Sequence, residues 1–139
     1  MNIFCSISSA SCKFDDFNDP VFAGSFDNIL KVYENGKDVE ARENMLEASY
    51  LAGIAFTRAY VGYVHAIAHN FGGMYGTPHG LANAVILPYV LEFYGKKAYK
   101  PLAKLADIAG VGKNLKTKEE KAKAFIAEIK AMEKRMEIP

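Results

Sequence analysis

A run of 33 residues, 59–91, contains no aspartate, glutamate, lysine or arginine. A helix that spans a bilayer needs about 20 apolar residues without interruption. Here Gly72-Gly73, Gly76 and Pro78 interrupt the run near its middle, and all three histidines of the chain lie within it. A protein interior can satisfy imidazole rings and the backbone of a turn, whereas lipid cannot. The run therefore predicts two buried helices joined by a turn and argues against a membrane span.

Helical spacing of apolar residues extends over most of the remaining chain. Residues 72–77 are expected to form the turn between the two buried helices, and Pro88 is expected to kink the second of them. Thr117-Lys-Glu-Glu120 matches the capping box that starts a helix. No segment alternates polar and β-branched residues with the period of a strand. The sequence therefore predicts an all-α bundle of about five to six helices, with starts near Asp19, Asp38, Tyr63, His79, Ala98 and Thr117.

The composition restricts the classes of partner and the cellular location that we expect for this chain. Lysines and arginines number 17 against 16 aspartates and glutamates, so we expect no nucleic-acid partner, which would need a basic surface. The lysine-rich C-terminal segment also carries glutamates, among them Glu133, which is typical of a solvated helix face. Cys5 and Cys12 form neither a disulfide framework nor a CxxC site, and the N-terminal segment lacks the basic region of a secretory signal. These features predict reduced thiols in a cytoplasmic protein without a membrane partner.

The three histidines fall in one window of fifteen residues, from His65 to His79. His65 and His69 are four residues apart, so they project from one helix face about 6 Å apart. A turn at Gly72-Gly73 could bring His79 to the same space, because glycine permits sharp backbone angles. A lone histidine on an apolar helix is more often an ordinary core or surface residue. Three in one uncharged window favour a metal or catalytic site, suited to Zn²⁺ or Fe²⁺.

The other side chains of the window are expected to have structural roles. Asn83 is expected either to cap its helix or to form a hydrogen bond within it. Positions in a pocket wall or in the core are expected for Tyr63, Phe71, Met74 and Tyr75.

The histidine window belongs to a longer stretch with a specific pattern, Gly62-Tyr-Val-His65-Ala-Ile-Ala-His69-Asn-Phe-Gly-Gly-Met-Tyr-Gly-Thr-Pro-His79-Gly80-Leu-Ala-Asn-Ala-Val-Ile-Leu-Pro88. This stretch strongly resembles the signature of the iron-containing (group III) alcohol dehydrogenases. Residues 35–45 and 48–58 resemble the same family, and the resemblance covers residues 29–139. It implies part of the dehydroquinate-synthase-like C-terminal helical domain, which holds a divalent metal, while a separate α/β domain binds NAD(P).

The resemblance also implies roles for the histidines. In this family the metal takes an aspartate and three histidines, and by position His65 and His79 match the last two of these metal ligands. His69 matches a catalytic histidine near the metal and the nicotinamide, assigned to proton relay or positioning. The implied cofactors are Fe²⁺ (or Zn²⁺) and, in an intact enzyme, NAD(P), and the implied substrates are small alcohols and aldehydes. The metal would act as a Lewis acid on the alcohol oxygen, so that hydride can leave to the nicotinamide.

Two family features are absent from these 139 residues. No histidine precedes His65, so the Asp-x-x-x-His motif that supplies the other ligands is missing. No predicted strand is followed by a glycine-rich loop and a helix, so a nucleotide-binding domain is missing as well. Residues 1–28 do not match the family. We therefore expect a partial helical metal-binding domain over residues 29–139, a fragment of an oxidoreductase without NAD-dependent turnover by itself.

Two other functions fit the same sequence. One is a non-catalytic helical protein that binds a partner or forms a homo-oligomer through exposed apolar surface and retains a vestigial metal site. The other is a stand-alone metal protein in which His69 joins His65 and His79 as a third ligand.

Overall fold

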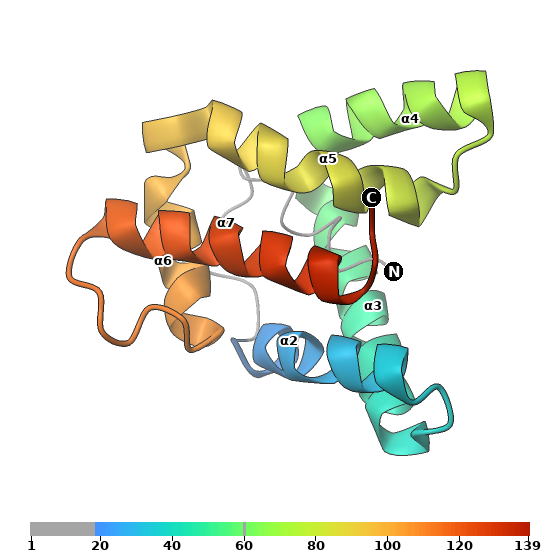
Figure 1. Ribbon diagram of the computed structural model, residues 1–139, viewed down its shortest axis with the longest axis horizontal. Helices are drawn as coiled ribbons and strands as arrows, with labels where there is room; N and C mark the ends of the chain where they lie inside the picture. Colours follow the sequence, from blue (N-terminus) through green and yellow to red (C-terminus); the bar gives the residue numbers. More distant parts are fainter. Residues whose placement is uncertain (1–18, 60) are drawn as a thin grey trace.

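The computed structural model describes residues 19–59 and 61–139. Within these ranges the chain forms six α-helices and one turn of 3-10 helix and contains no β-strand, which confirms the predicted all-α fold. Figure 1 shows their arrangement. In chain order the elements are α2 (Asp19–Glu34), α3 (Val39–Ala59), α4 (Tyr63–Tyr75), α5 (His79–Tyr94), η2 (Gly95–Lys97), α6 (Tyr99–Ile108) and α7 (Lys118–Arg135).

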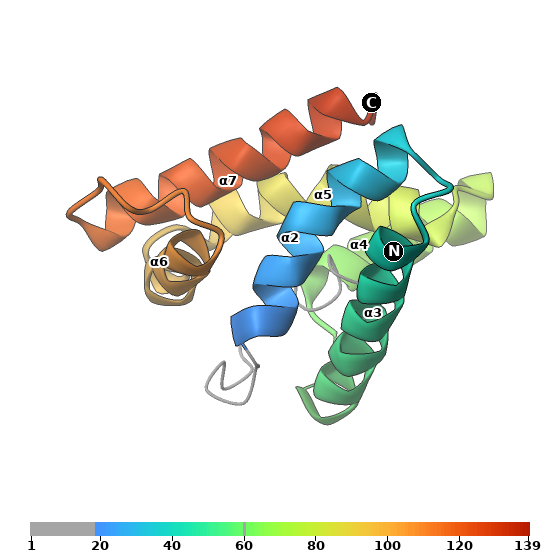
Figure 2. The same cartoon turned by 90° about the horizontal axis from the view of Figure 1, so that it is seen from below.

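Helix α5 lies between α4 and α7. It has a single charged residue, Glu92, and apolar residues on nearly every side, which is typical of a helix that packs on more than one neighbour. Helix α4 runs antiparallel along one side of α5 and α7 runs antiparallel along another (Figure 1 and Figure 2). Leu87 and Leu91 of α5 and Phe125 of α7 have almost no exposed surface. The α5–α7 contact therefore forms the middle of the hydrophobic core, while α6 packs on α7 and α2 packs on α3.

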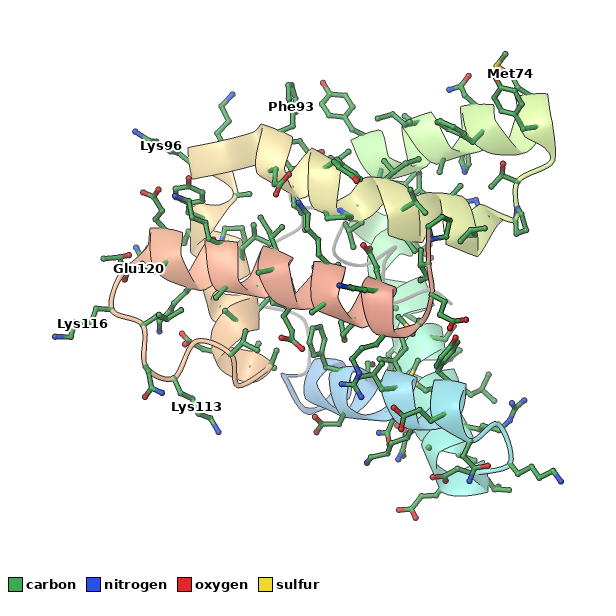
Figure 3. The ribbon with its side chains drawn as sticks, viewed as in Figure 1. Met74, Phe93, Lys96, Lys113, Lys116 and Glu120 are labelled. Carbon is green, nitrogen blue, oxygen red and sulfur yellow. The ribbon has the colours of Figure 1, made fainter. Side chains whose placement is uncertain are left out.

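Side-chain caps explain where α3 and α7 begin. The carboxylate of Asp38 accepts a hydrogen bond of 3.0 Å from the backbone N–H of Ala41. At α7, the backbone N–H of Glu120 donates to the Thr117 hydroxyl, and the backbone N–H of Thr117 donates to the Glu120 carboxylate. This is the capping box that the sequence predicts, and Glu120 is labelled at this end of α7 in Figure 3.

The C-terminal end of α7 is closed by a Schellman motif. The N–H of Ile138 donates to the carbonyl of Glu133 at 2.9 Å, and the N–H of Glu137 donates to the carbonyl of Lys134 at 3.2 Å. Glu137 has a φ of 54°, a left-handed conformation that glycine adopts more readily than glutamate.

The turn between α4 and α5 lies later than the sequence predicts. Helix α4 continues through Gly72-Gly73 to Tyr75, so these two glycines are helical and the prediction of a turn there is wrong. The chain reverses at Gly76, whose φ of 65° is left-handed and whose N–H donates to the carbonyl of Gly72. Packing of α4 on α5 overrides the weak helix propensity of the paired glycines. Pro78 then precedes α5, which continues through Pro88 to Tyr94.

Four residues that were expected in a pocket wall or core are exposed, namely Tyr63, Phe71, Met74 and Tyr75. Successive residues of an α-helix are about 100° apart, so Tyr63 lies on nearly the opposite side of α4 from His65. Figure 3 shows Met74 at the far end of α4, directed away from α5 and α7. The apolar sequence of α4 is therefore divided between a face that packs on α5 and an exposed face.

The burial of Glu133 also differs from the prediction. Glu133 was expected on a solvated helix face, but only 9% of its surface is exposed. It follows Ile126 and Ile129 at i+7 and i+4 on the face of α7 that packs into the core. Its position on the helix, and not its charge, determines its burial.

No helix in the part of the chain that the structure describes is both long enough and apolar enough to cross a bilayer. Cys5 and Cys12 lie outside the described residues.

Candidate functional site

The three histidine rings form a triangle between α4 and the first turn of α5. The centroid of the His65 ring lies 5.8 Å from that of His69 and 5.2 Å from that of His79, and the His69 and His79 centroids are 5.2 Å apart. His65 and His69 share one face of α4, and the reversal at Gly76 and Pro78 brings the start of α5 back against it. The structure thus places all three sequence-predicted site residues together.

The triangle has a buried side and an open side. His65 is 3% exposed, and Val64 and Ala68 of the same helix are buried as well. His69 and His79 are exposed. A small molecule or an ion that reaches these two rings from solvent therefore meets His65 as the inner wall of the site.

Burial also sets the protonation state of the inner ring. Desolvation lowers the pKa of His65 below the usual value for histidine, and the nearby rings of His79 and then His69 lower this pKa further through charge repulsion. A histidine with a lowered pKa is neutral at physiological pH. Neutral imidazole is the form that binds a metal ion.

Asn83 is the polar neighbour of His79. It lies one turn further along α5, with 1% of its surface exposed. Its Nδ2 lies 3.0 Å from Nε2 of His79 and donates to the carbonyl of His79 at 2.9 Å. The backbone bond confirms the expected hydrogen bond within the helix, whereas the contact with the ring was not predicted. Sequence spacing could have indicated it, because residues i and i+4 are neighbours on a helix.

The histidines fit a divalent ion as part of its ligand set. Imidazoles that share one ion through bonds of about 2.0–2.1 Å have ring centroids about 5 Å apart, close to the spacing of this triangle. However, no group of three or more His, Cys, Asp or Glu side chains in residues 19–59 and 61–139 is placed to hold an ion by itself. In addition, Nε2 of His79 faces the amide of Asn83. A complete site needs further ligands and release of that contact.

A cavity of about 390 Å³ lies elsewhere, between α5, η2, the start of α6 and α7. Its wall includes the ion pair of Lys130 with Glu92, 2.5 Å apart, and the ring of Tyr99. It contains no histidine and is separate from the triangle.

Residues 15–139 match the family described as Fe-containing alcohol dehydrogenase family, C-terminal. This match begins 14 residues before Ile29, where the resemblance seen in the sequence alone begins. The chain belongs to this family. The NADPH-dependent butanol dehydrogenase of Clostridium saccharobutylicum is 39% identical over 127 residues, which cover 88% of this chain and 32% of the relative. Alcohol dehydrogenase 4 of Schizosaccharomyces pombe is 49% identical over 81 residues, or 58% of this chain and 19% of the relative.

Solved structures agree with this membership. A crystal structure of 1,3-propanediol oxidoreductase superposes with a TM-score of 0.83 at 33% identity, over 96% of this chain and 37% of that protein. The alcohol dehydrogenase from Oenococcus oeni gives a TM-score of 0.82 at 31% identity. The chain therefore spans between 19% and 37% of the length of these four relatives, and its helices correspond to their C-terminal region.

Proposed function

We propose that this chain supplies part of the metal site of an iron-type alcohol dehydrogenase, an oxidoreductase that interconverts small alcohols and aldehydes with NAD(P). His65 and His79 serve as two ligands of Fe²⁺ or Zn²⁺, and His69 serves as the catalytic proton-relay or positioning residue. Residues 29–139 form the partial metal-binding domain in this proposal, and the cytoplasm is its location. The three-ring triangle is the observation that carries the proposal.

The geometry supports a different proposed task for each histidine. His65 is buried and held neutral, so it can offer a lone pair from the inner wall without losing a proton. His79 is fixed at the first turn of α5 behind Pro78, which directs its ring across to α4. His69 is exposed, so it can exchange a proton with solvent or with a substrate hydroxyl. A bound divalent ion would supply Lewis acidity that favours loss of the hydroxyl proton and hydride transfer to nicotinamide.

Calorimetric titration of the 139-residue chain with Zn²⁺, or with Fe²⁺ under anaerobic conditions, tests this proposal. We expect weak binding of one ion. His65→Ala and His79→Ala should each weaken binding by at least about tenfold, since even the loss of an outer partner costs 10–100-fold. His69→Ala should retain most of the affinity. Asn70→Ala is the matched control, because exposed Asn70 adjoins His69 and its amide bonds only the backbone of Ala66 in the described structure.

Other outcomes would contradict the proposal. If the wild-type chain binds neither ion, the histidines do not form a working half of the site. If His69→Ala weakens binding as much as the other two substitutions, the chain is a three-histidine metal protein. A stable oligomer that binds no metal would support the helical interaction protein instead.

A further inference from the structure

We propose that Asn83 is a positioning residue that sets the tautomer of His79 and so keeps the Nε2 lone pair ready for a ligand. The proposed role of Asn83 in metal binding rests on the proposed role of His79 as a metal ligand. The predicted tautomer of His79 does not depend on that role, because it follows from the contacts of Asn83 alone. Among residues 19–59 and 61–139, this amide is the only group that forms a hydrogen bond with the His79 ring.

The orientation of the Asn83 amide is fixed by the backbone. One amide atom lies 2.9 Å from the carbonyl oxygen of His79 and 3.0 Å from Nε2 of its ring. A carbonyl oxygen only accepts hydrogen bonds, so the amide atom beside it must be the NH₂ nitrogen. The flipped amide would place two oxygens in contact and is excluded.

This orientation decides which ring nitrogen of His79 carries the proton. The NH₂ group of Asn83 has two hydrogens and no acceptor. It can donate one to the His79 carbonyl and the other to Nε2. Nε2 must then be the unprotonated nitrogen, and the neutral ring must carry its hydrogen on Nδ1.

The same contact determines how His79 can bind a metal ion. Binding through Nδ1 would require a proton on Nε2, which would face the hydrogens of the Asn83 amide. Binding through Nε2 keeps the proton on Nδ1, where Asn83 has already placed it. An ion would therefore replace Asn83 as the partner of Nε2, and the amide would keep its bond to the His79 carbonyl. Without an ion, the Asn83 amide occupies the position next to Nε2 that the ion would take.

The burial of Asn83 supports a specific role. The side chain is 1% exposed, and its Oδ1 is buried without a hydrogen-bond partner among the described residues. An unsatisfied buried acceptor costs about 1–3 kcal/mol. An apolar residue at this position would avoid that cost, but it could not donate to the carbonyl and the ring of His79.

Nitrogen-15 NMR of the histidine rings tests the inference on the full metal-free chain with a chelator present, at a pH where the rings are neutral. In the wild type, the Nδ1–H form of His79 should predominate. In Asn83→Leu, the ratio of Nδ1–H to Nε2–H forms should fall about fivefold, which corresponds to one ordinary hydrogen bond. In Asn83→Asp, which has the same shape but only acceptor atoms, Nε2 should carry a proton.

Asn70→Ala is the control, because the Asn70 amide makes the same i−4 backbone bond on α4 and, within the described part of the chain, forms no hydrogen bond with a histidine ring. It should leave the His79 ratio unchanged. An Nε2–H tautomer in the wild type would overturn the inference even if both Asn83 variants fail to fold. An unchanged ratio in a folded Asn83→Leu chain would overturn it as well. Because no metal is added, failure here is distinguishable from failure to bind Zn²⁺.

Discussion

The buried carboxyl of Glu133 should make the stability of the fold depend on pH. Its side chain is on the buried face of α7, and its Oε1 has no hydrogen-bond partner in the described part of the chain. Desolvation raises the pKa of Glu133 from 4.5 to about 7, and the ammonium group of Lys130 opposes this rise only partly. The carboxyl group is therefore more difficult to ionise in the folded chain than in the unfolded chain.

The sign and size of the effect follow from this difference. Below the unfolded pKa both states are protonated, and the folded state keeps its full stability. As the pH rises, the unfolded chain ionises first, and stability falls until the pH exceeds the folded pKa of about 7. The full shift corresponds to roughly 3 kcal/mol. Because 9% of the Glu133 surface stays exposed and Lys130 partly offsets its burial, we expect a measured loss of about 1–3 kcal/mol.

Urea unfolding near pH 5 and near pH 8.5 measures this loss. The free energy of unfolding of the wild type should fall between these two values by about 1–3 kcal/mol more than that of Glu133→Gln, whose amide cannot ionise. Glu47→Gln, at an exposed position of α3, is the matched control and should follow the wild type. Equal pH dependence of the wild type and Glu133→Gln would refute the reasoning, because it would show that the carboxyl group is not desolvated.

Three further predictions concern single contacts. Glu137→Gly should stabilise the chain by about 1 kcal/mol, because glycine adopts the positive φ of the Schellman motif without strain. Glu137→Ala is the control and should not raise the stability. A melting temperature of Glu137→Gly below that of the wild type would contradict this prediction. Thr117→Ala should destabilise it by about 1 kcal/mol through loss of the capping box, and urea unfolding that shows no change would refute the cap. His79→Ala should raise the pKa of His65, because a source of positive charge is removed; an NMR titration of His65 checks the direction, and a lower pKa would be inconsistent with it.

The sequence predicted the helices and the pairing of His65 with His69 because both follow from local spacing, whereas the approach of His79 depends on the chain reversal at Gly76. Residues four apart share a helix face, so His65 and His69 had to be neighbours, and the apolar run of α5 had to lie in the core. The turn was misplaced because Gly72-Gly73 has weak helix propensity, while packing against α5 keeps the pair helical. The burial of Glu133 was missed because its lysine-rich surroundings indicate a solvated face. Only the position of α7 in the fold decides which of its sides is covered.

The contact between Asn83 and the His79 ring could be predicted from the sequence only in part. Its separation from His79 by four residues could have predicted it. The direction of the amide depends on the backbone carbonyl of His79, which a sequence pattern does not describe.

X-ray absorption of the Zn²⁺-loaded 139-residue chain tests the central claim most directly, because it counts the imidazoles around the ion. We expect two imidazole nitrogens in the wild type, from His65 and His79, the same number in His69→Ala, and one fewer in His79→Ala. Three imidazoles in the wild type that fall to two in His69→Ala would contradict the assignment of His69. A count that does not change in His79→Ala would contradict a shared ion at this triangle.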